Sequence, residues 1–202
     1  AELFLASLIS TASYTYFTFG NTLQLLPVGL FGTSIAKAAL PTLARQADTP
    51  AAFRRTLFGA LYQVSFLVFP IATVLIVLRI PIVRLVFGTD IFSWEATVQT
   101  SMVVSAFAIG VFFQAASSLL ARGFYALHDT RTPVAVSLVA IVLNISLDFV
   151  LIRGFGLAVW GLAVAFSFAS FFQATVLFFI INKKIDDGVK FKAVLHIIKA
   201  VQ

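Results

Sequence analysis

The sequence lacks the residues on which many soluble folds and metal sites depend. It contains no cysteine, so disulfide bonds and thiolate metal sites are excluded. Its two histidines, His128 and His196, lie far apart and neither has an acidic cluster beside it, so no metal site is expected. Charged residues make up only 11% of the chain, whereas a soluble domain carries about 25%. So few charges cannot cover a water-exposed surface, which indicates a protein covered by lipid.

Motifs that carry catalysis are also missing. The chain has no nucleophile elbow, no phosphate-binding loop and no acid/base pair within its apolar segments. The sequence therefore predicts no enzyme, no cofactor and no metal. Its net charge of +6 does not indicate a nucleic-acid partner, because membrane proteins concentrate Lys and Arg in their cytoplasmic loops.

Long apolar segments dominate what is present. Hydrophobic residues make up 60% of the chain, and a transmembrane helix needs about 20 of them in succession. We predict an all-α polytopic transmembrane helix bundle with spans at about 12–46, 51–78, 95–120, 133–152 and 157–181. Residues 185–202 mix Lys with apolar side chains, which is typical of a basic amphipathic segment, here leading to a truncated further helix. Because the chain opens on an apolar stretch without Met, we expect a fragment of a longer protein.

The first apolar segment is too long for a straight span. About 35 helical residues extend roughly 50 Å, and the bilayer core is about 30 Å thick. Proline removes a helical hydrogen bond, so Pro27, with Gly29 and Gly32 after it, is the expected hinge.

Polar side chains inside a span are costly in lipid, so they mark cavities or helix contacts. The first segment holds Lys37, which either contacts an anion in a cavity or extends to the headgroups. In the fourth, Ser137, Asn144 and Asp148 share one helical face that must meet protein or water, and the last two are candidates for an ion or polar contact. Three single amides are expected to join helices: Gln63, Gln114 and Gln173.

Orientation follows from the distribution of cations. Ten lie on one side of the predicted spans and three on the other, Arg79, Arg84 and Arg153. The positive-inside rule makes the first side cytoplasmic, with loops near 45–55, 121–132 and 182–199. The ten are Arg45, Arg54, Arg55, Arg122, Arg131, Lys183, Lys184, Lys190, Lys192 and Lys199.

Two stretches resemble one known family. Residues 26–32 read LPVGLFG and are followed by Ile35-Ala36 and by LPTL at 40–43. Residues 122–133 read RGFYALHDTRTP. Both are similar to the MurJ/MviN family, the second to the loop between its tenth and eleventh helices. Leu5-Ala6-Ser7, Asn144 and Gly156-Leu157-Ala158 match as well.

That family comprises lipid II flippases of the multidrug/oligosaccharidyl-lipid/polysaccharide exporter superfamily. The resemblance implies that residues 1–184 form the C-terminal lobe of a two-lobe transporter, from the end of helix seven to the start of helix thirteen. It implies a bacterial inner-membrane protein that carries a polyprenyl-pyrophosphate-linked peptidoglycan precursor by alternating access. The implied partners are this lipid-linked glycan, membrane lipids, the missing N-terminal lobe and cell-wall synthesis proteins. The implied cavity residues are Asn21, Thr22, Gln24 and Lys37, and Arg122, Asp129 and Arg131 would fix the cytoplasmic loop.

The sequence departs from the family at charged positions. Many members have an acidic residue and then Arg shortly before the motif proline, where this chain has Asn21 and Thr22. Lys37 lies about 15 residues further on, roughly 22 Å along a helix, so it would move the anion site toward the cytoplasm. Glu2 keeps the acidic charge expected near the end of helix seven, but Leu3 replaces the Arg after it.

Three functions stay open at this point. The first is lipid II flipping. The second is a related polysaccharide-lipid flippase or a cation-coupled drug antiporter, for which Asp148 is the available intramembrane carboxylate. The third is a scaffold for cell-wall synthesis that transports nothing, suggested by the missing Arg.

Overall fold

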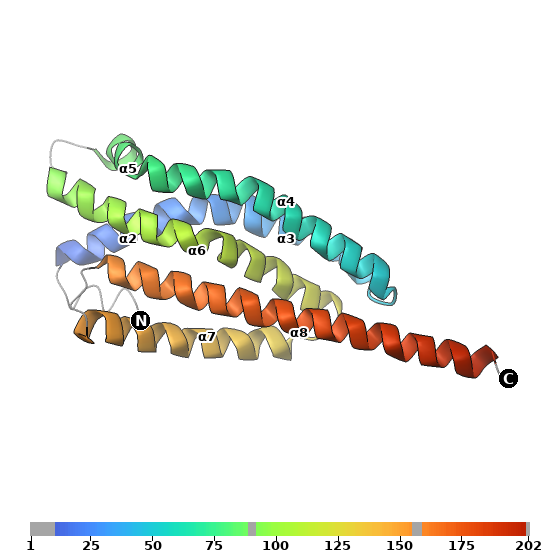
Figure 1. Ribbon diagram of the computed structural model, residues 1–202. Coiled ribbons are helices and arrows are strands. Elements are labelled where there is room, and N and C mark those ends of the chain that lie inside the picture. Colours follow the sequence, from blue (N-terminus) through green and yellow to red (C-terminus); the bar gives the residue numbers. More distant parts are fainter. Residues whose placement is uncertain (1–10, 89–91, 155–158, 201–202) are drawn as a thin grey trace.

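The computed structural model describes residues 11–88, 92–154 and 159–200, with side chains for 13–88, 92–152 and 159–186. Every regular element in this part of the chain is a helix, and the helices form an elongated bundle (Figure 1). The predicted all-α class is confirmed. In chain order the elements are α2 Thr11–Pro27, the π-helix η1 Val28–Thr33, α3 Ser34–Arg45, α4 Pro50–Val77, α5 Arg79–Phe87, α6 Trp94–Ala126, α7 Arg131–Phe149, the π-helix η2 Val150–Gly154 and α8 Trp160–Ala200.

Within the described residues, five helical stretches are long and apolar enough to cross a membrane, the number that the sequence predicts. Large apolar side chains face outward from them, for example Leu30 and Val142, each 64% exposed. A soluble protein rarely leaves a continuous apolar surface exposed, so lipid is the natural cover for this one. The five stretches are Ser13–Arg45, Pro50–Val77, Trp94–Ala126, Arg131–Ile152 and Trp160–Asp186.

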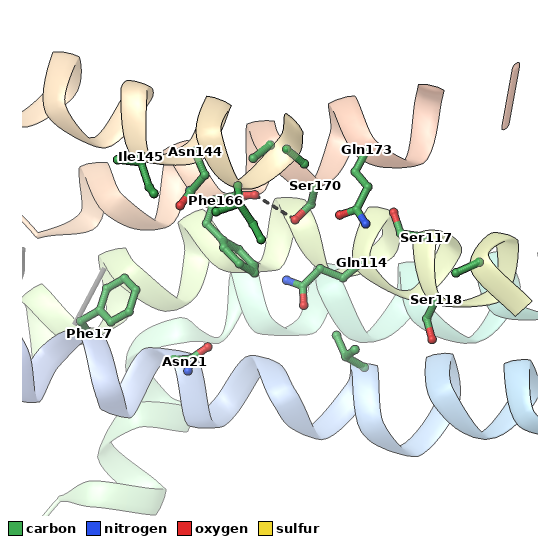
Figure 2. Close-up of a pocket in the computed structure, with 15 residues that line it drawn as sticks. Phe17, Asn21, Gln114, Ser117, Ser118, Asn144, Ile145, Phe166, Ser170 and Gln173 are labelled. Carbon is green, nitrogen blue, oxygen red and sulfur yellow. Dashed lines mark hydrogen bonds between the residues drawn. The ribbon is translucent and has the colours of Figure 1, made fainter. Parts of the chain in front are cut away.

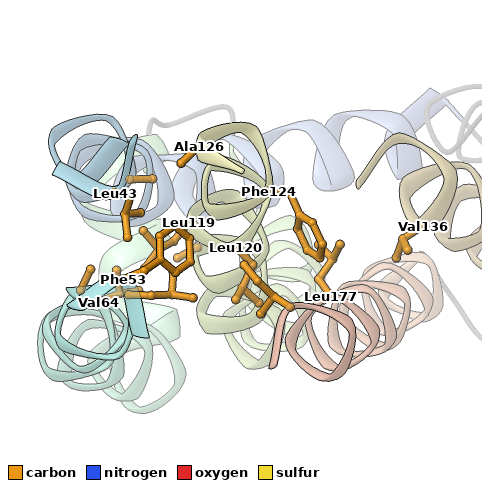
Figure 3. Close-up of a cluster of buried hydrophobic side chains, with 14 of the residues drawn as sticks. Leu43, Phe53, Val64, Leu119, Leu120, Phe124, Ala126, Val136 and Leu177 are labelled. Atoms are coloured by element: carbon orange, nitrogen blue, oxygen red, sulfur yellow. The ribbon is translucent and has the colours of Figure 1, made fainter. Parts of the chain in front are cut away.

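Helix α6 is the central element. It packs against α2, η1, α3, α4, α5, α7 and α8, and 67% of its most apolar stretch is buried, against 39% or less in the other four spans. Figure 3 shows the larger buried cluster, in which α6 meets α3, α4 and α8. Leu119, Leu120 and Phe124 of α6 pack there with Leu43, Phe53, Val64 and Leu177.

Helices α6 and α8 cross very closely at Gly110. A Cβ atom on Gly110 would lie 2.5 Å from Ser167 Oγ and 2.8 Å from Ser167 Cα, so only glycine fits at this crossing. The Ser167 hydroxyl donates a hydrogen bond to the carbonyl oxygen of Ala106 at 2.7 Å. A second set of small residues on α8 recurs every four positions and lies on another face than Ser167, because residues two apart on a helix point about 200° apart. They are Gly161, Ala165 and Ala169, all buried.

The α-helix of the first span is interrupted at Pro27, the residue predicted as the hinge. Helix α2 ends at Pro27, and the π-helix η1 begins at the next residue. Proline cannot donate the usual backbone bond, and π-turns arise where the helical ladder is disturbed in this way. Gly32 in η1 lies against α6, where a Cβ would be 2.7 Å from Ala115 Cβ, whereas Gly29 has open space beside it.

The connection between α6 and α7 is a Schellman turn with histidine in the left-handed position. The N–H of His128 donates to Tyr125 O and that of Asp129 donates to Phe124 O, both at 3.0 Å. His128 has φ 58°, a conformation usually reserved for glycine. Thr132 is of a residue type that often caps helices and lies directly before Pro133, but it is not the N-cap of α7. The helix begins at Arg131, and Asp129 instead accepts bonds from the Thr132 N–H and hydroxyl, at 3.0 and 2.7 Å.

Two features lie outside the predicted spans. Residues 79–87 form the short helix α5, which lies between the predicted spans 51–78 and 95–120. Helix α8 continues without a break to Ala200, through most of the predicted amphipathic segment 185–202. Arg54 of α4 contacts Asp186 of α8 at 3.2 Å, so the start of α4 and the later part of α8 lie at the same end of the bundle (Figure 1).

Candidate functional site

A pocket of about 610 Å³ lies among α2, α6, α7 and α8 (Figure 2). Its apolar lining includes Phe17 and Phe166. The polar groups that line it are amides and hydroxyls, and none of its described lining side chains is charged. Such groups can both donate and accept hydrogen bonds without carrying a charge into the membrane. They are Asn21, Gln114, Ser117, Ser118, Asn144, Ser170 and Gln173.

A chain of three amides forms one side of this polar pocket. The Gln24 side-chain N–H donates to Asn21 Oδ1 at 2.7 Å, and Gln24 Oε1 accepts from Gln114 Nε2 at 2.8 Å. Gln24 is only 1% exposed, so burial between α2 and α6 orients its amide. The hydrogen bonds among these three amides do not use the Asn21 N–H₂ or the Gln114 carbonyl, which can face the pocket. Figure 2 shows that the Asn21 and Gln114 side chains come from different helices.

Helices α7 and α8 supply the opposite side. Gln173 Nε2 donates to Ser137 Oγ at 2.9 Å, which links the two helices. The predicted role of Gln114 and Gln173 as interhelical amides is therefore confirmed, and both also line the pocket.

Ser117 is 6% exposed, and its hydroxyl oxygen has no hydrogen-bond partner among the described residues. A buried hydroxyl without a partner costs about 1–3 kcal/mol, which a water or a polar ligand in the pocket would recover.

The predicted cavity residues fall in three different places. Asn21 lines the pocket, and Gln24 lies behind it within the amide chain. Thr22 is exposed and donates its hydroxyl proton to Thr18 O at 2.8 Å, within its own helix. Lys37 is exposed on α3, outside the pocket lining. Contact with substrate stays a prediction for all four.

The predicted polar face of α7 does meet protein. Asn144 is 8% exposed and lines the pocket, while Asp148 is fully buried one turn further on. Three further lining residues are not predicted from the sequence: Ser117, Ser118 and Ser170. The positions 114, 117, 118 and 121 follow a three- and four-residue spacing, so these α6 residues share one helical face, and that pattern was the available signal.

The three loop residues differ in how firmly they are held. Asp129 accepts an ion-pair hydrogen bond from Lys184 Nζ of α8 at 2.6 Å, in addition to the Thr132 bonds. The Lys184 ammonium and the Thr132 donors hold the pKa of the Asp129 carboxyl well below its usual range. Arg122 is half-buried with no partner for its Nε in the described part of the chain, and Arg131 is exposed. Asp129 thus ties the α6–α7 connection to α8.

The bundle and its pocket define a class of protein: a multi-pass helical membrane protein with an uncharged polar cavity between its helices. A family model described as "Lipid II flippase MurJ" matches residues 1–201. The chain belongs to this family, and the five apolar spans among its described residues make it a multi-pass protein of the bacterial inner membrane.

Individual relatives agree with the family match. A probable lipid II flippase MurJ of Synechocystis is 32% identical over 187 residues, which is 91% of this chain and 34% of the relative. One from Vibrio cholerae is 32% identical over 179 residues, or 88% of this chain and 34% of the relative. A solved structure titled "Lipid II flippase MurJ, inward closed conformation" superposes with a TM-score of 0.79 at 27% identity, covering 88% of this chain and 38% of that one. The chain therefore spans about a third of the length of these curated relatives.

Proposed function

We propose that the complete protein moves lipid II across the inner membrane by alternating access, as a transporter rather than an enzyme. The family match over residues 1–201 is the observation that carries this proposal. The described chain would serve as the C-terminal lobe, with Pro27, Gly29 and Gly32 acting as its hinge. The second lobe would come from the remainder of the protein, because this chain spans about a third of the relatives' length.

We assign the polar pocket to the hydrophilic part of the substrate. Sugars and peptide groups present neutral donors and acceptors, and the amides of Asn21, Gln114 and Gln173 match them in kind. The pyrophosphate needs a cation, which the pocket lining does not contain, and we assign that contact to Lys37 on α3.

The test uses the full-length protein in a bacterium depleted of its own lipid II flippase. Loss of one hydrogen bond costs about 1 kcal/mol, so Gln114→Leu and Gln173→Leu should each lower flipping about fivefold at equal membrane abundance. Gln63→Leu is the matched control, because Gln63 is an exposed amide on α4 outside the pocket. Full flipping by both pocket variants would remove the pocket from the mechanism, and full flipping by Lys37→Ala would remove Lys37.

We propose that the end of the bundle bearing Arg54, Asp129 and Lys184 faces the cytoplasm. The ion pairs Arg54–Asp186 and Lys184–Asp129 gather these charges at one end, which supports the cation count. This chain has no cysteine, so a Thr130→Cys variant, with any cysteines elsewhere in the full-length protein removed, reports on this loop. An impermeant maleimide should label it in inverted vesicles and not in intact cells; the reverse pattern would invert the topology.

A further inference from the structure

A second cavity, unlike the polar pocket, opens among α4, α6 and α8. It measures about 510 Å³, and aromatic rings form much of its lining. We call it the aromatic groove and define it by Phe58 and Tyr62 of α4, Phe112 and Phe113 of α6, and Phe178 and Phe179 of α8. It belongs to no part of the mechanism above.

The walls of the aromatic groove hold their shape through ring contacts. Phe58 and Phe178 meet edge to face across the groove, with centroids 5.7 Å apart. Phe112 and Phe113 are 5.3 Å apart in a similar arrangement. At the rim, Tyr62 and Phe179 are 72% and 67% exposed. The groove therefore presents a preformed apolar surface within the two spans Pro50–Val77 and Trp160–Asp186, where the surrounding medium is lipid.

Cations stand at one end of the groove. Arg54 lies one helical turn before Phe58, with its guanidinium carbon 5.6 Å from the ring centroid. Lys183 follows Phe179 by one turn on α8, and Arg55 adjoins Arg54. Arg54 and Asp186 join α4 and α8 at this end, so all three cations belong to the helical turns next to this contact.

The charge of this end favours an anionic ligand. Of these three cations only Arg54 pairs with a described carboxylate, Asp186, so Arg55 and Lys183 keep their charges free of an ion pair among the described residues. The Arg54–Asp186 pair is 3.2 Å long with side chains 52% and 55% exposed, and an exposed pair of this kind is worth about 0–1 kcal/mol. A phosphate can therefore join or replace Asp186 at little cost, and the bond to Asp186 uses one of five guanidinium N–H donors.

We propose that the aromatic groove holds an anionic glycerophospholipid of the surrounding bilayer, with its acyl chains against the rings and its headgroup phosphate at Arg54, Arg55 and Lys183. The four residues between each cation and its ring rise about 6 Å along the helix, the displacement expected between the upper carbons of an acyl chain and the phosphate. This lipid is bound and not transported, so the proposal does not depend on lipid II flipping.

The test places a fluorescent reporter at the rim. Phe179→Trp is introduced into the full-length protein, which is reconstituted into phosphatidylcholine vesicles that contain brominated phosphatidylglycerol or brominated phosphatidylcholine at equal mole fraction. Bromine quenches a nearby tryptophan, and the fluorescence of unsubstituted protein is subtracted. Phe168→Trp is the matched control, because Phe168 is a 54% exposed phenylalanine of the same helix outside the groove.

We expect phosphatidylglycerol to compete for the Phe179→Trp site at least about fivefold better than phosphatidylcholine, and both lipids to quench Phe168→Trp equally. Arg54→Gln or Lys183→Gln should each lower this preference about fivefold, while Lys183→Arg should retain it. Equal quenching by the two lipids at Phe179→Trp would overturn the proposal. So would a Phe179→Trp signal that neither lipid quenches, since a protein segment would then cover the groove.

Discussion

The crossing of α6 and α8 at Gly110 gives a sharp test of how the bundle is packed. In Gly110→Ala the new methyl carbon would lie 2.5 Å from Ser167 Oγ and 2.8 Å from Ser167 Cα. A hydroxyl can rotate away, but a backbone carbon cannot, so the helices must separate. Forcing a methyl group into a full core costs about 1–3 kcal/mol. Weakening the Ser167–Ala106 bond adds about 0.6 kcal/mol, and alanine recovers about 1 kcal/mol of helix propensity. The net expectation is a loss of about 2 kcal/mol.

The assay is equilibrium unfolding of the full-length protein in detergent micelles, followed by circular dichroism. Gly59→Ala is the matched control, because Gly59 is exposed in α4 and a Cβ there meets nothing within 4 Å. That variant should gain up to about 1 kcal/mol. Gly110→Ala should stay destabilising in a Ser167→Ala background, since the contact with the backbone carbon remains. Equal stability of Gly110→Ala and Gly59→Ala would refute the close crossing.

Two further predictions concern the α6–α7 connection. His128→Gly should stabilise the protein by about 1 kcal/mol in the same unfolding assay, because glycine adopts φ 58° without the steric cost of a Cβ; an unchanged or lower stability would contradict the Schellman turn. The pKa of Asp129 is lowered in the folded state, so its contribution is complete above the ordinary aspartate pKa of about 4 and is lost as the pH falls below it. Unfolding measured from pH 7 to pH 3 should therefore depend less on pH in Asp129→Asn, and an unchanged acid dependence would exclude the ion pair with Lys184.

Periodicity and composition were sufficient for the number of spans and for the polar face of α7. Both features follow from the bilayer, which acts on each segment separately because every segment must keep its polar atoms away from lipid. The start of α7 is hard to predict because Thr132 lies next to Pro133 and is of a type that caps helices. In the structure Asp129 accepts the N–H of Thr132 and also pairs with Lys184, a partner 55 residues away in the sequence. Helix α5 is not predicted because its residues Arg79, Pro81 and Arg84 are typical of a loop between two spans.

The polar pocket was harder to predict because its members are ordinary residues taken one at a time. Gln24 lies in the first span and Gln114 in the third, and only the packing of α2 on α6 makes them a chain. The same packing separates Thr22 from Asn21, since neighbours on a helix point about 100° apart. Asn21 and Thr22 therefore share one prediction, contact with the cavity, although only Asn21 lines the pocket in the structure.

The distribution of charge in this chain bears on the proposed contact with a pyrophosphate. The described lining of the polar pocket is uncharged, and the cations Arg54 and Lys184 are paired with carboxylates at one end of the bundle. A pyrophosphate at membrane depth needs a compensating cation, because an isolated charge in a low-dielectric site is strongly disfavoured. Within this chain Lys37 is the candidate, exposed on the segment that follows the π-helix. Lys37→Ala in the full-length protein therefore separates two mechanisms: a large loss of flipping would assign the anion contact to Lys37, whereas full activity would assign it to other residues of that protein.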